Sequence, residues 1–357
     1  MRKLLFILVA GVMLGACSKS VDSNFTKEDV TRFMTTEEFK VPVESEKVTV
    51  VMVGEDTIAV AYSEFPILIP KGIEPQISYM DVDGIASQKN LSRGYSDSFI
   101  NKIDVGVNKA KLFQVICFED SRAGDYDYND LVIHVKYQQS GNIFGFGVQP
   151  VALGSRKDIK LGYEVYKGNN FVASGMITEG KTCREQMFND GKGNEYEGFL
   201  NVMHNEINFD RNRTYLGSTI RSWDISKIEG DGAMRVEWFI EVDGGTRLYA
   251  LSTEHLKETL DAEKRPYGLV ITETGMQYED AQGGVNGKDW FNYPQETKHI
   301  KDVYPEIWEW IIGEKEYDGK IYDSGREVCP AGAYNANELG VYVIKDDSDV
   351  CSGGRQN

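Results

Sequence analysis

The residues with the clearest chemical potential lie in one short acidic segment. Its twelve positions contain five carboxylates and one amide: Glu119, Asp120, Asp125, Asp127, Asn129 and Asp130. Like charges this close repel one another unless water, a base or a cation neutralises them. The segment has no His or Cys, which argues against zinc, copper or iron and favours a hard cation with oxygen ligands. We therefore predict a calcium site formed by these six residues.

The spacing of the acids suggests how the oxygens converge. Asp125, Asp127 and Asn129 occupy alternate positions, and on extended backbone such side chains point to one face. Glu119 and Asp120 reach the same rim if the segment folds back as a hairpin. Calcium takes six to eight oxygens, so backbone carbonyls and water would complete the shell.

Other interpretations of this segment remain open. Asp130 lies on the opposite side of the row, and it closes the site only if the backbone turns there. The EF-hand is excluded, because loop position six would be Asp130 instead of Gly and position twelve Lys136 instead of Glu. A solvated acidic turn, or a hydrogen-bonded clasp of the hairpin, is one alternative. A pair of carboxylates set roughly 5 to 9.5 Å apart for glycoside hydrolysis is another.

The elements around the segment are predicted to be strands. Apolar runs with β-type residues flank it, Leu112–Phe118 before and Leu131–Tyr137 after. Further strand-like runs cover residues 47–53, 57–62, 143–148, 159–165 and 235–242. Near the end the period changes to that of two short helices, about 294–303 and 305–312, each with a proline where a helix can begin. The sequence thus predicts a mainly β fold, an antiparallel β-sandwich with short C-terminal helices.

The first seventeen residues have the features of a targeting segment. Arg2 and Lys3 precede an apolar run that is too short to span a bilayer permanently. Leu14-Gly-Ala-Cys17 resembles the lipobox of bacterial lipoproteins, which implies cleavage before Cys17 and acylation of that residue. Two or three acyl chains anchor a protein stably. We therefore expect a lipid-anchored protein of the cell envelope, with the membrane as a partner through Cys17.

The net charge and the cysteines limit the partners and the covalent links that this protein can have. The formal charge of −17 becomes −19 once Arg2 and Lys3 are removed, which argues against nucleic acid as a partner. Four cysteines remain after Cys17, and a disulfide between Cys329 and Cys351 is one candidate in an exported protein. No His-Glu-x-x-His or Gly-x-Ser-x-Gly motif occurs in the sequence.

One stretch of the chain also resembles a known family. Gly124-Asp-Tyr-Asp-Tyr-Asn-Asp-Leu-Val132, after Phe118-Glu-Asp120, resembles the opening signature of the LruC-domain family of bacterial cell-surface lipoproteins. Phe144-Gly-Phe-Gly-Val148 and Phe291-Asn-Tyr-Pro-Gln-Glu296 are similar to later parts of that family. The resemblance implies a jelly-roll-like sandwich displayed at the envelope, from about residue 80 to 312. It implies no activity.

Together these features give an expected organisation. Residues 1–17 are the lipoprotein signal peptide and lipobox, 18–45 a tether, 46–312 the β-sandwich, and 313–357 a C-terminal tail. We expect a non-enzymatic protein, anchored at the outer membrane and exposed at the surface, that binds a glycan or a surface protein. The alternatives are a carbohydrate-active hydrolase that uses carboxylates of the same rim, and an adhesion or assembly subunit.

Overall fold

The computed structural model describes residues 24–54, 56–81, 106–121, 124–187, 200–201, 219–272, 291, 293–294, 298–319, 333–335 and 340–342. Cys17, Cys329 and Cys351 lie outside these ranges, as do the signal peptide and most of the tail. Within the described ranges, no helix has the length and apolarity needed to cross a bilayer.

The secondary structure is dominated by strands. The strands are β1 (Thr36–Val41), β2 (Lys47–Val53), β3 (Asp56–Ala61), β4 (Phe65–Pro70), β5 (Gln76–Asp81), β6 (Lys109–Phe118), β7 (Leu131–Ser140), β8 (Ile143–Leu153), β9 (Ile159–Lys167), β10 (Asn170–Met176), β11 (Leu200–Asn201), β12 (Thr219–Asp224), β13 (Met234–Val242), β14 (Thr246–Tyr249), β15 (Gly268–Thr272), β16 (Ala333–Asn335) and β17 (Gly340–Tyr342). The helices are α1 (Lys27–Thr31), α4 (Cys183–Met187), the 3₁₀ turn η1 (Ile225–Lys227), α5 (Leu256–Thr259), α6 (Ile300–Val303) and α7 (Pro305–Ile312).

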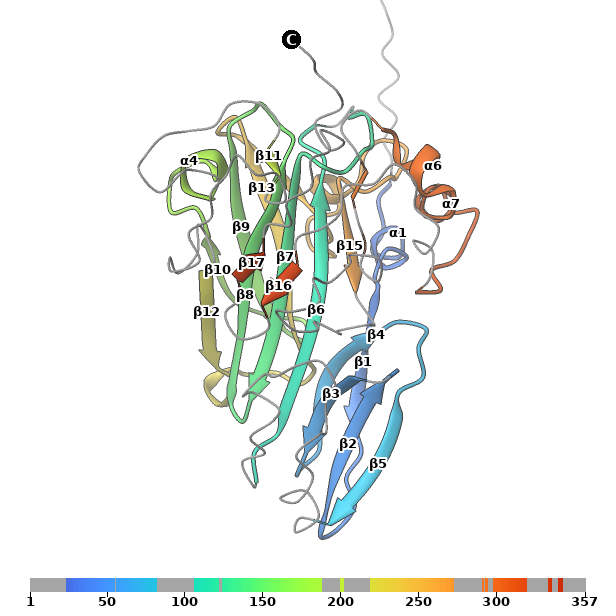
Figure 1. Cartoon of the computed structure of the whole chain (residues 1–357), viewed down its shortest axis with the longest axis vertical. Helices are drawn as coiled ribbons and strands as arrows, with labels where there is room; N and C mark the ends of the chain where they lie inside the picture. The colour runs from blue at the N-terminus through green and yellow to red at the C-terminus, as the bar shows by residue number, and fades with distance from the viewer. Residues whose placement is uncertain are drawn as a thin grey trace, which may run out of the picture.

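The described strands form two main antiparallel sheets (Figure 1). The larger has the order β11-β8-β7-β6-β3-β2-β5, with β12 also paired to β8 and β15 to β6. The smaller has the order β10-β9-β13-β14. Two two-stranded sheets, β1-β4 and β16-β17, complete the set. The predicted antiparallel β-sandwich with short C-terminal helices is confirmed.

An aromatic cluster joins the two main sheets across the core. The Trp238 ring on β13 lies 4.9 Å from Phe146 on β8, and its Nε1 donates a hydrogen bond to Tyr137 Oη on β7 at 2.8 Å. The Phe146 ring also meets Tyr163 on β9 at 5.1 Å. Phe144, Phe146 and Val148 share one face of β8 because side chains alternate along a strand, so the glycines between them face the other way.

The hairpin β6–β7 forms the middle of the larger sheet. Its register runs from Lys109↔Ser140 to Phe118↔Leu131 without a shift, and every residue of β6 is buried. His134, in the middle of β7, packs edge-on against Phe113 with the ring centroids 5.3 Å apart. This long regular hairpin fixes the position of the acidic segment, which connects its two strands.

The fold begins earlier in the chain than the expected boundary at residue 46. Thr26 caps α1 with a capping box, as a helix start at this position requires. Val30 and Phe33 are buried, and β1 pairs with β4 from Thr36↔Pro70 to Val41↔Phe65. Residues 24–45, expected to be tether, are therefore part of the sandwich. Polar composition concealed this, because the pairing with β4 buries only a few apolar side chains.

The C-terminal helices lie at the end of the molecule at which β6 finishes (Figure 1). Pro305 occupies the first position of α7, and Gly313 ends this helix in the left-handed conformation. The earlier of the two predicted helices is shorter than expected, since α6 covers only Ile300–Val303. Ile307, Trp310 and Ile311 of α7 are buried against the sandwich.

Candidate metal centre

The acidic segment converges as a compact carboxylate cluster. Glu119, Asp125 and Asp127 each place one carboxylate oxygen within 4.8 Å of the others. Glu119 and Asp127 are buried, whereas Asp125 is exposed to solvent. The segment thus presents one buried side and one open side, which is the arrangement a cation would need to enter from water and be held by the protein.

Glu119 is the most informative member of this cluster. Its side chain is 1 % exposed, and its Oε1 accepts a hydrogen bond from the Tyr128 backbone N–H at 2.7 Å. Its Oε2 is buried and has no hydrogen-bond partner among the described residues. Burial, and then the nearby charges of Asp130 and Asp127, raise the pKa of Glu119 well above its usual range. A cation at Oε2 would give this oxygen a partner and would favour the ionised form of the carboxylate.

Gly124 provides the space for that oxygen. A Cβ atom built at Gly124 would lie 1.8 Å from Glu119 Oε2, far inside any van der Waals contact. Residue 124 therefore must be glycine for the Glu119 carboxylate to occupy its position. The Gly-Asp-Tyr-Asp run places the glycine one residue before the first ligand candidate of the loop, Asp125.

The loop backbone differs from the extended strand that the spacing suggested. Tyr126 and Tyr128 have φ of 55° and 52°, in the left-handed region that non-glycine residues rarely adopt. Left-handed residues between the acids turn the chain at each step. Asp125 and Asp127 thus approach Glu119 through successive turns, instead of standing on one face of a strand.

The strained tyrosines are fixed by partners distant in sequence. Tyr128 Oη donates to the carbonyl of Pro266 at 2.9 Å, and Tyr126 Oη donates to Asp261 Oδ2 at 2.7 Å. The Arg265 guanidinium lies over the Tyr126 ring at 4.6 Å and also pairs with Asp261 at 2.7 Å. The structure holds this conformation from outside the loop, as strained functional segments require.

The other three predicted ligands have protein partners. Asp130 Oδ2 accepts from the Asp120 backbone N–H at 2.7 Å, which closes the base of the loop. Asp120 forms an ion pair with Lys157 at 2.6 Å and accepts a hydrogen bond from Ser155. Asn129 Nδ2 donates to the carbonyl of Pro294 at 3.3 Å. The six acidic-loop residues thus divide into a cluster of three and a set that clasps the hairpin and its surroundings.

Two further features were not apparent from the sequence. One is a buried network on the smaller sheet, in which Glu164 accepts hydrogen bonds from Tyr166 Oη (2.7 Å) and Tyr249 Oη (2.9 Å), and contacts His255 Nε2 (3.1 Å). Burial alone would raise the pKa of Glu164, but these hydrogen bonds together lower it. The sequence indicates only that Glu164 lies in the strand predicted over residues 159–165, and no motif marks its partners.

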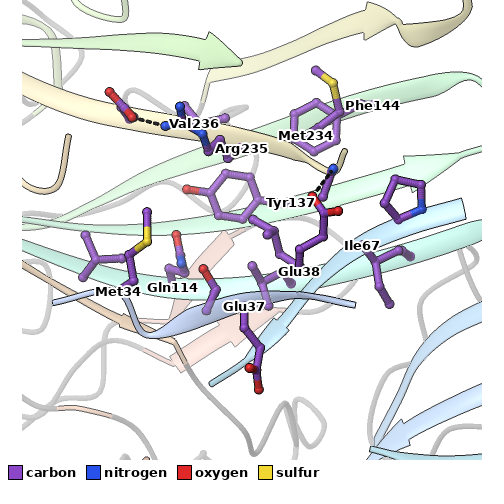
Figure 2. A pocket seen from close by; sticks show the side chains of 18 of the residues that line it. Met34, Glu37, Glu38, Ile67, Gln114, Tyr137, Phe144, Met234, Arg235 and Val236 are labelled. Atoms are coloured by element: carbon purple, nitrogen blue, oxygen red, sulfur yellow. Dashed lines mark hydrogen bonds and ion pairs between the residues drawn. The ribbon is translucent and has the colours of Figure 1, made fainter. Parts of the chain in front are cut away.

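The second feature is a cavity of about 460 Å³ between the sheets (Figure 2). β14 pairs with β13 only from Phe239 to Val242, so the first half of β13 lacks a second strand neighbour in the described part of the chain. The sheet β1-β4 covers this gap, with Glu38 accepting a hydrogen bond from the Ala233 N–H at 2.8 Å. No sequence motif marks the cavity, because six or more elements contribute to it.

The structure places two of the cysteines and two of the tryptophans. Cys117 and Cys183 are buried free thiols. Trp238 belongs to the core and Trp223 packs against Phe146 at 5.5 Å. The predicted lipidation site and the predicted disulfide lie outside the described residues.

Comparisons with known proteins identify no family. No family model matches the chain, and no curated protein sequence matches it. A crystal structure of a Bacteroides ovatus protein, named as a lipoprotein, is similar to 82 % of this chain and 92 % of its own, with 10 % sequence identity and a TM-score of 0.35.

Proposed function

We propose that this protein is a lipid-anchored cell-envelope β-sandwich stabilised by Ca²⁺ at Glu119, Asp125 and Asp127. The observation that carries the cation site is the buried Glu119 Oε2, which lacks a hydrogen-bond partner in the described part of the chain, on a carboxylate that clusters with those of Asp125 and Asp127 within 4.8 Å. A buried ionised oxygen without a partner is costly, and a cation compensates for it.

The donor set favours calcium among the cations. All three side chains offer oxygen, which suits hard cations and not zinc or copper. The loop is irregular, with left-handed residues at Tyr126 and Tyr128, and calcium tolerates irregular geometry better than magnesium does. Loop carbonyls and water at the exposed Asp125 would supply the remaining ligands.

The proposed location depends on the sequence alone. Cys17 at the end of the targeting segment supports lipid anchoring, and the resemblance of the Gly124–Val132 motif to the LruC-domain family supports display at the cell surface, with the outer membrane as the membrane concerned. Glycan binding, or adhesion through a surface protein, is kept as the proposed role of the displayed sandwich. A glycan array with the chain from Ser18 onwards tests the first of these.

A hydrolase based on the same carboxylates is the weaker candidate. A glycosidase needs two carboxylates that flank a sugar bond across an accessible site. Here Glu119 and Asp127 are buried beneath one loop, together with a third carboxylate, and only Asp125 is exposed. Turnover of a glycoside that is abolished by the single change Asp125→Asn would favour the hydrolase over the structural site.

Thermal melting tests the calcium proposal. The chain from Ser18 onwards contains every described residue; after treatment with EGTA it should melt at a higher temperature when Ca²⁺ is added, because a ligand of the folded state stabilises it by mass action. Asp125→Asn with Asp127→Asn should remove this shift. Asp231→Asn, which changes another exposed aspartate, is the control and should retain it. An unchanged wild-type melt, with no heat of calcium binding by calorimetry, would refute the site.

A further inference from the structure

The cavity between the sheets has predominantly apolar walls (Figure 2). Its lining includes apolar side chains from both main sheets, from β4 and from the segment between α1 and β1: Met34, Ile67, Leu112, Phe144, Met234 and Val236. Protein interiors are packed to the density of organic crystals, and voids much larger than a water molecule are few. A volume of about 460 Å³ lies in the range of small-molecule sites, roughly 300 to 1,000 Å³.

The charged side chains that line this cavity, Lys111 among them, have interactions within the protein, with one exception. Glu38 accepts a hydrogen bond from the Ala233 N–H at 2.8 Å, and Glu37 accepts one from the Gly72 N–H at 3.3 Å. Arg235 forms an ion pair with Glu237. Polar ligands rich in hydroxyl groups, such as sugars, would therefore leave hydrogen-bonding groups unmatched against the apolar walls.

Lys71 is the exception among the charged lining residues. It follows β4, and its backbone N–H donates to the Thr35 carbonyl at 2.9 Å, which fixes its position beside the cavity. Its ammonium group has no ion pair within the described ranges of the chain, and the residue is only partly buried. A cation without an ion pair at the side of an apolar cavity is complementary to a molecule with one anionic head and an apolar body.

We propose that this cavity binds a single-chain amphiphile, with its aliphatic chain between the two sheets and its anionic head group at Lys71. The site is separate from the carboxylate cluster and does not depend on calcium. Met34 and Met234 are both part of the lining, and unbranched methionine side chains adapt to flexible ligands. A fatty acid, or one acyl chain of a lipid, has this chemistry.

Binding of a fluorescent fatty acid, cis-parinaric acid, to the delipidated chain from Ser18 onwards tests this proposal. Saturated acids of eight to sixteen carbons should displace the probe, with affinity rising about fourfold per added CH₂ until the cavity is full. Val236→Phe and Leu112→Phe narrow the cavity from opposite sheets, and each should weaken probe binding at least tenfold. If one of these variants fails to fold, the chain-length series and the other variant still test whether the cavity binds the aliphatic chain.

The head-group assignment has its own control. Lys71→Gln should weaken binding of the acids about two- to fivefold and leave the matching alcohols unchanged. Lys40→Gln removes an equal charge from β1, where Lys40 is exposed and pairs with Glu64, and should change neither. Displacement that is independent of chain length, or unchanged in both cavity-narrowing variants, would overturn the proposal, as would the absence of probe binding.

A further comparison identifies the source of the aliphatic chain. Protein acylated at Cys17 and purified in detergent should bind the probe as well as the chain from Ser18 does if the ligand is a free lipid. If the acyl chain attached at Cys17 occupies the cavity instead, the acylated protein should bind no probe until this chain is removed. Each result supports an aliphatic ligand, and they differ only in where the ligand comes from.

Discussion

Replacing Glu119 with Gln should show how much the buried carboxylate destabilises the calcium-free protein, and whether this carboxylate binds calcium. In calcium-free protein, the Glu119 carboxyl has one buried oxygen without a hydrogen-bond partner in the described part of the chain, and burial with the nearby charges of Asp130 and Asp127 disfavours its ionised form. The Gln amide is neutral at every pH and can present N–H donors to the neighbouring carboxylates of Asp125 and Asp127. The variant should therefore be more stable than the calcium-free wild type, although the substitution lies in the most acidic part of the protein.

The size of the effect follows from the contacts. Satisfying an unpaired buried polar atom is worth about 1 to 3 kcal/mol. For a domain of this size that raises the melting temperature by roughly 2 to 4 °C per kcal/mol. At a calcium concentration 100 times the dissociation constant, the wild type should gain about 2.7 kcal/mol by mass action, and Glu119→Gln should gain nothing. The order of stability should thus approach equality, or reverse, when calcium is added.

Chemical denaturation in EGTA and in excess Ca²⁺ provides the measurement. Glu164→Gln is the matched control, because Glu164 is also buried but both of its oxygens accept hydrogen bonds, from Tyr249 and Tyr166. That change should destabilise the protein by about 1 to 3 kcal/mol, with or without calcium. A less stable calcium-free Glu119→Gln protein would mean that Oε2 has a stabilising partner. A calcium response equal to that of the wild type would mean that Glu119 is not a ligand.

Further predictions concern the surroundings of the same loop and the core. Gly124→Ala should lose the calcium response, because the new Cβ would displace Glu119 Oε2, whereas Gly245→Ala, with no atom within 4 Å of its Cβ, should melt as the wild type does. Asp120→Asn should lower the unfolding free energy by about 1 to 2 kcal/mol through its Lys157 and Ser155 contacts, and retain the calcium response; loss of that response would place Asp120 among the ligands. Burial lowers the pKa of His134 to about 3, below its value of about 6.5 in unfolded chains, so its contribution to stability is fully present above pH 6.5 and is lost as the pH falls toward 3. The loss should be about 4 to 5 kcal/mol, and His134→Gln should flatten the corresponding slope in denaturation curves between pH 4 and 6.5; an unchanged slope would contradict this assignment.

Much of the fold could be read from local patterns in the sequence. The strand run 47–53 coincides with β2, and the helix start at Thr26 and the first position of α7 at Pro305 are where the capping and proline rules place them. These features depend on neighbouring residues only. β1 was missed because its pairing with β4 is decided by tertiary packing, which overrides a polar composition.

The residues of the candidate site could be predicted from the sequence, but their arrangement in space could not. Glu119, Asp125 and Asp127 do converge, but through the left-handed backbone of Tyr126 and Tyr128 and not through an extended strand. Nothing in the local sequence favours that conformation, since bulky side chains disfavour it. The partners that hold it lie far along the chain, as do the walls of the cavity, and one sequence gives no signal for such contacts.

The distance between these partners also determines when the loop can form. The hydrogen bonds from Tyr126 to Asp261 and from Tyr128 to Pro266 join residues 135 and 138 positions apart, and β15 pairs with β6 over a similar separation. Contacts between distant parts of a chain form late in folding, because closing a long loop costs entropy before the contact is made. During synthesis all residues of the hairpin β6–β7 are made long before residue 261. The acidic loop therefore adopts its final conformation only after residues 261–266 have been synthesised. Shorter chains contain the carboxylates but lack the hydrogen-bond partners of Tyr126 and Tyr128 that position them.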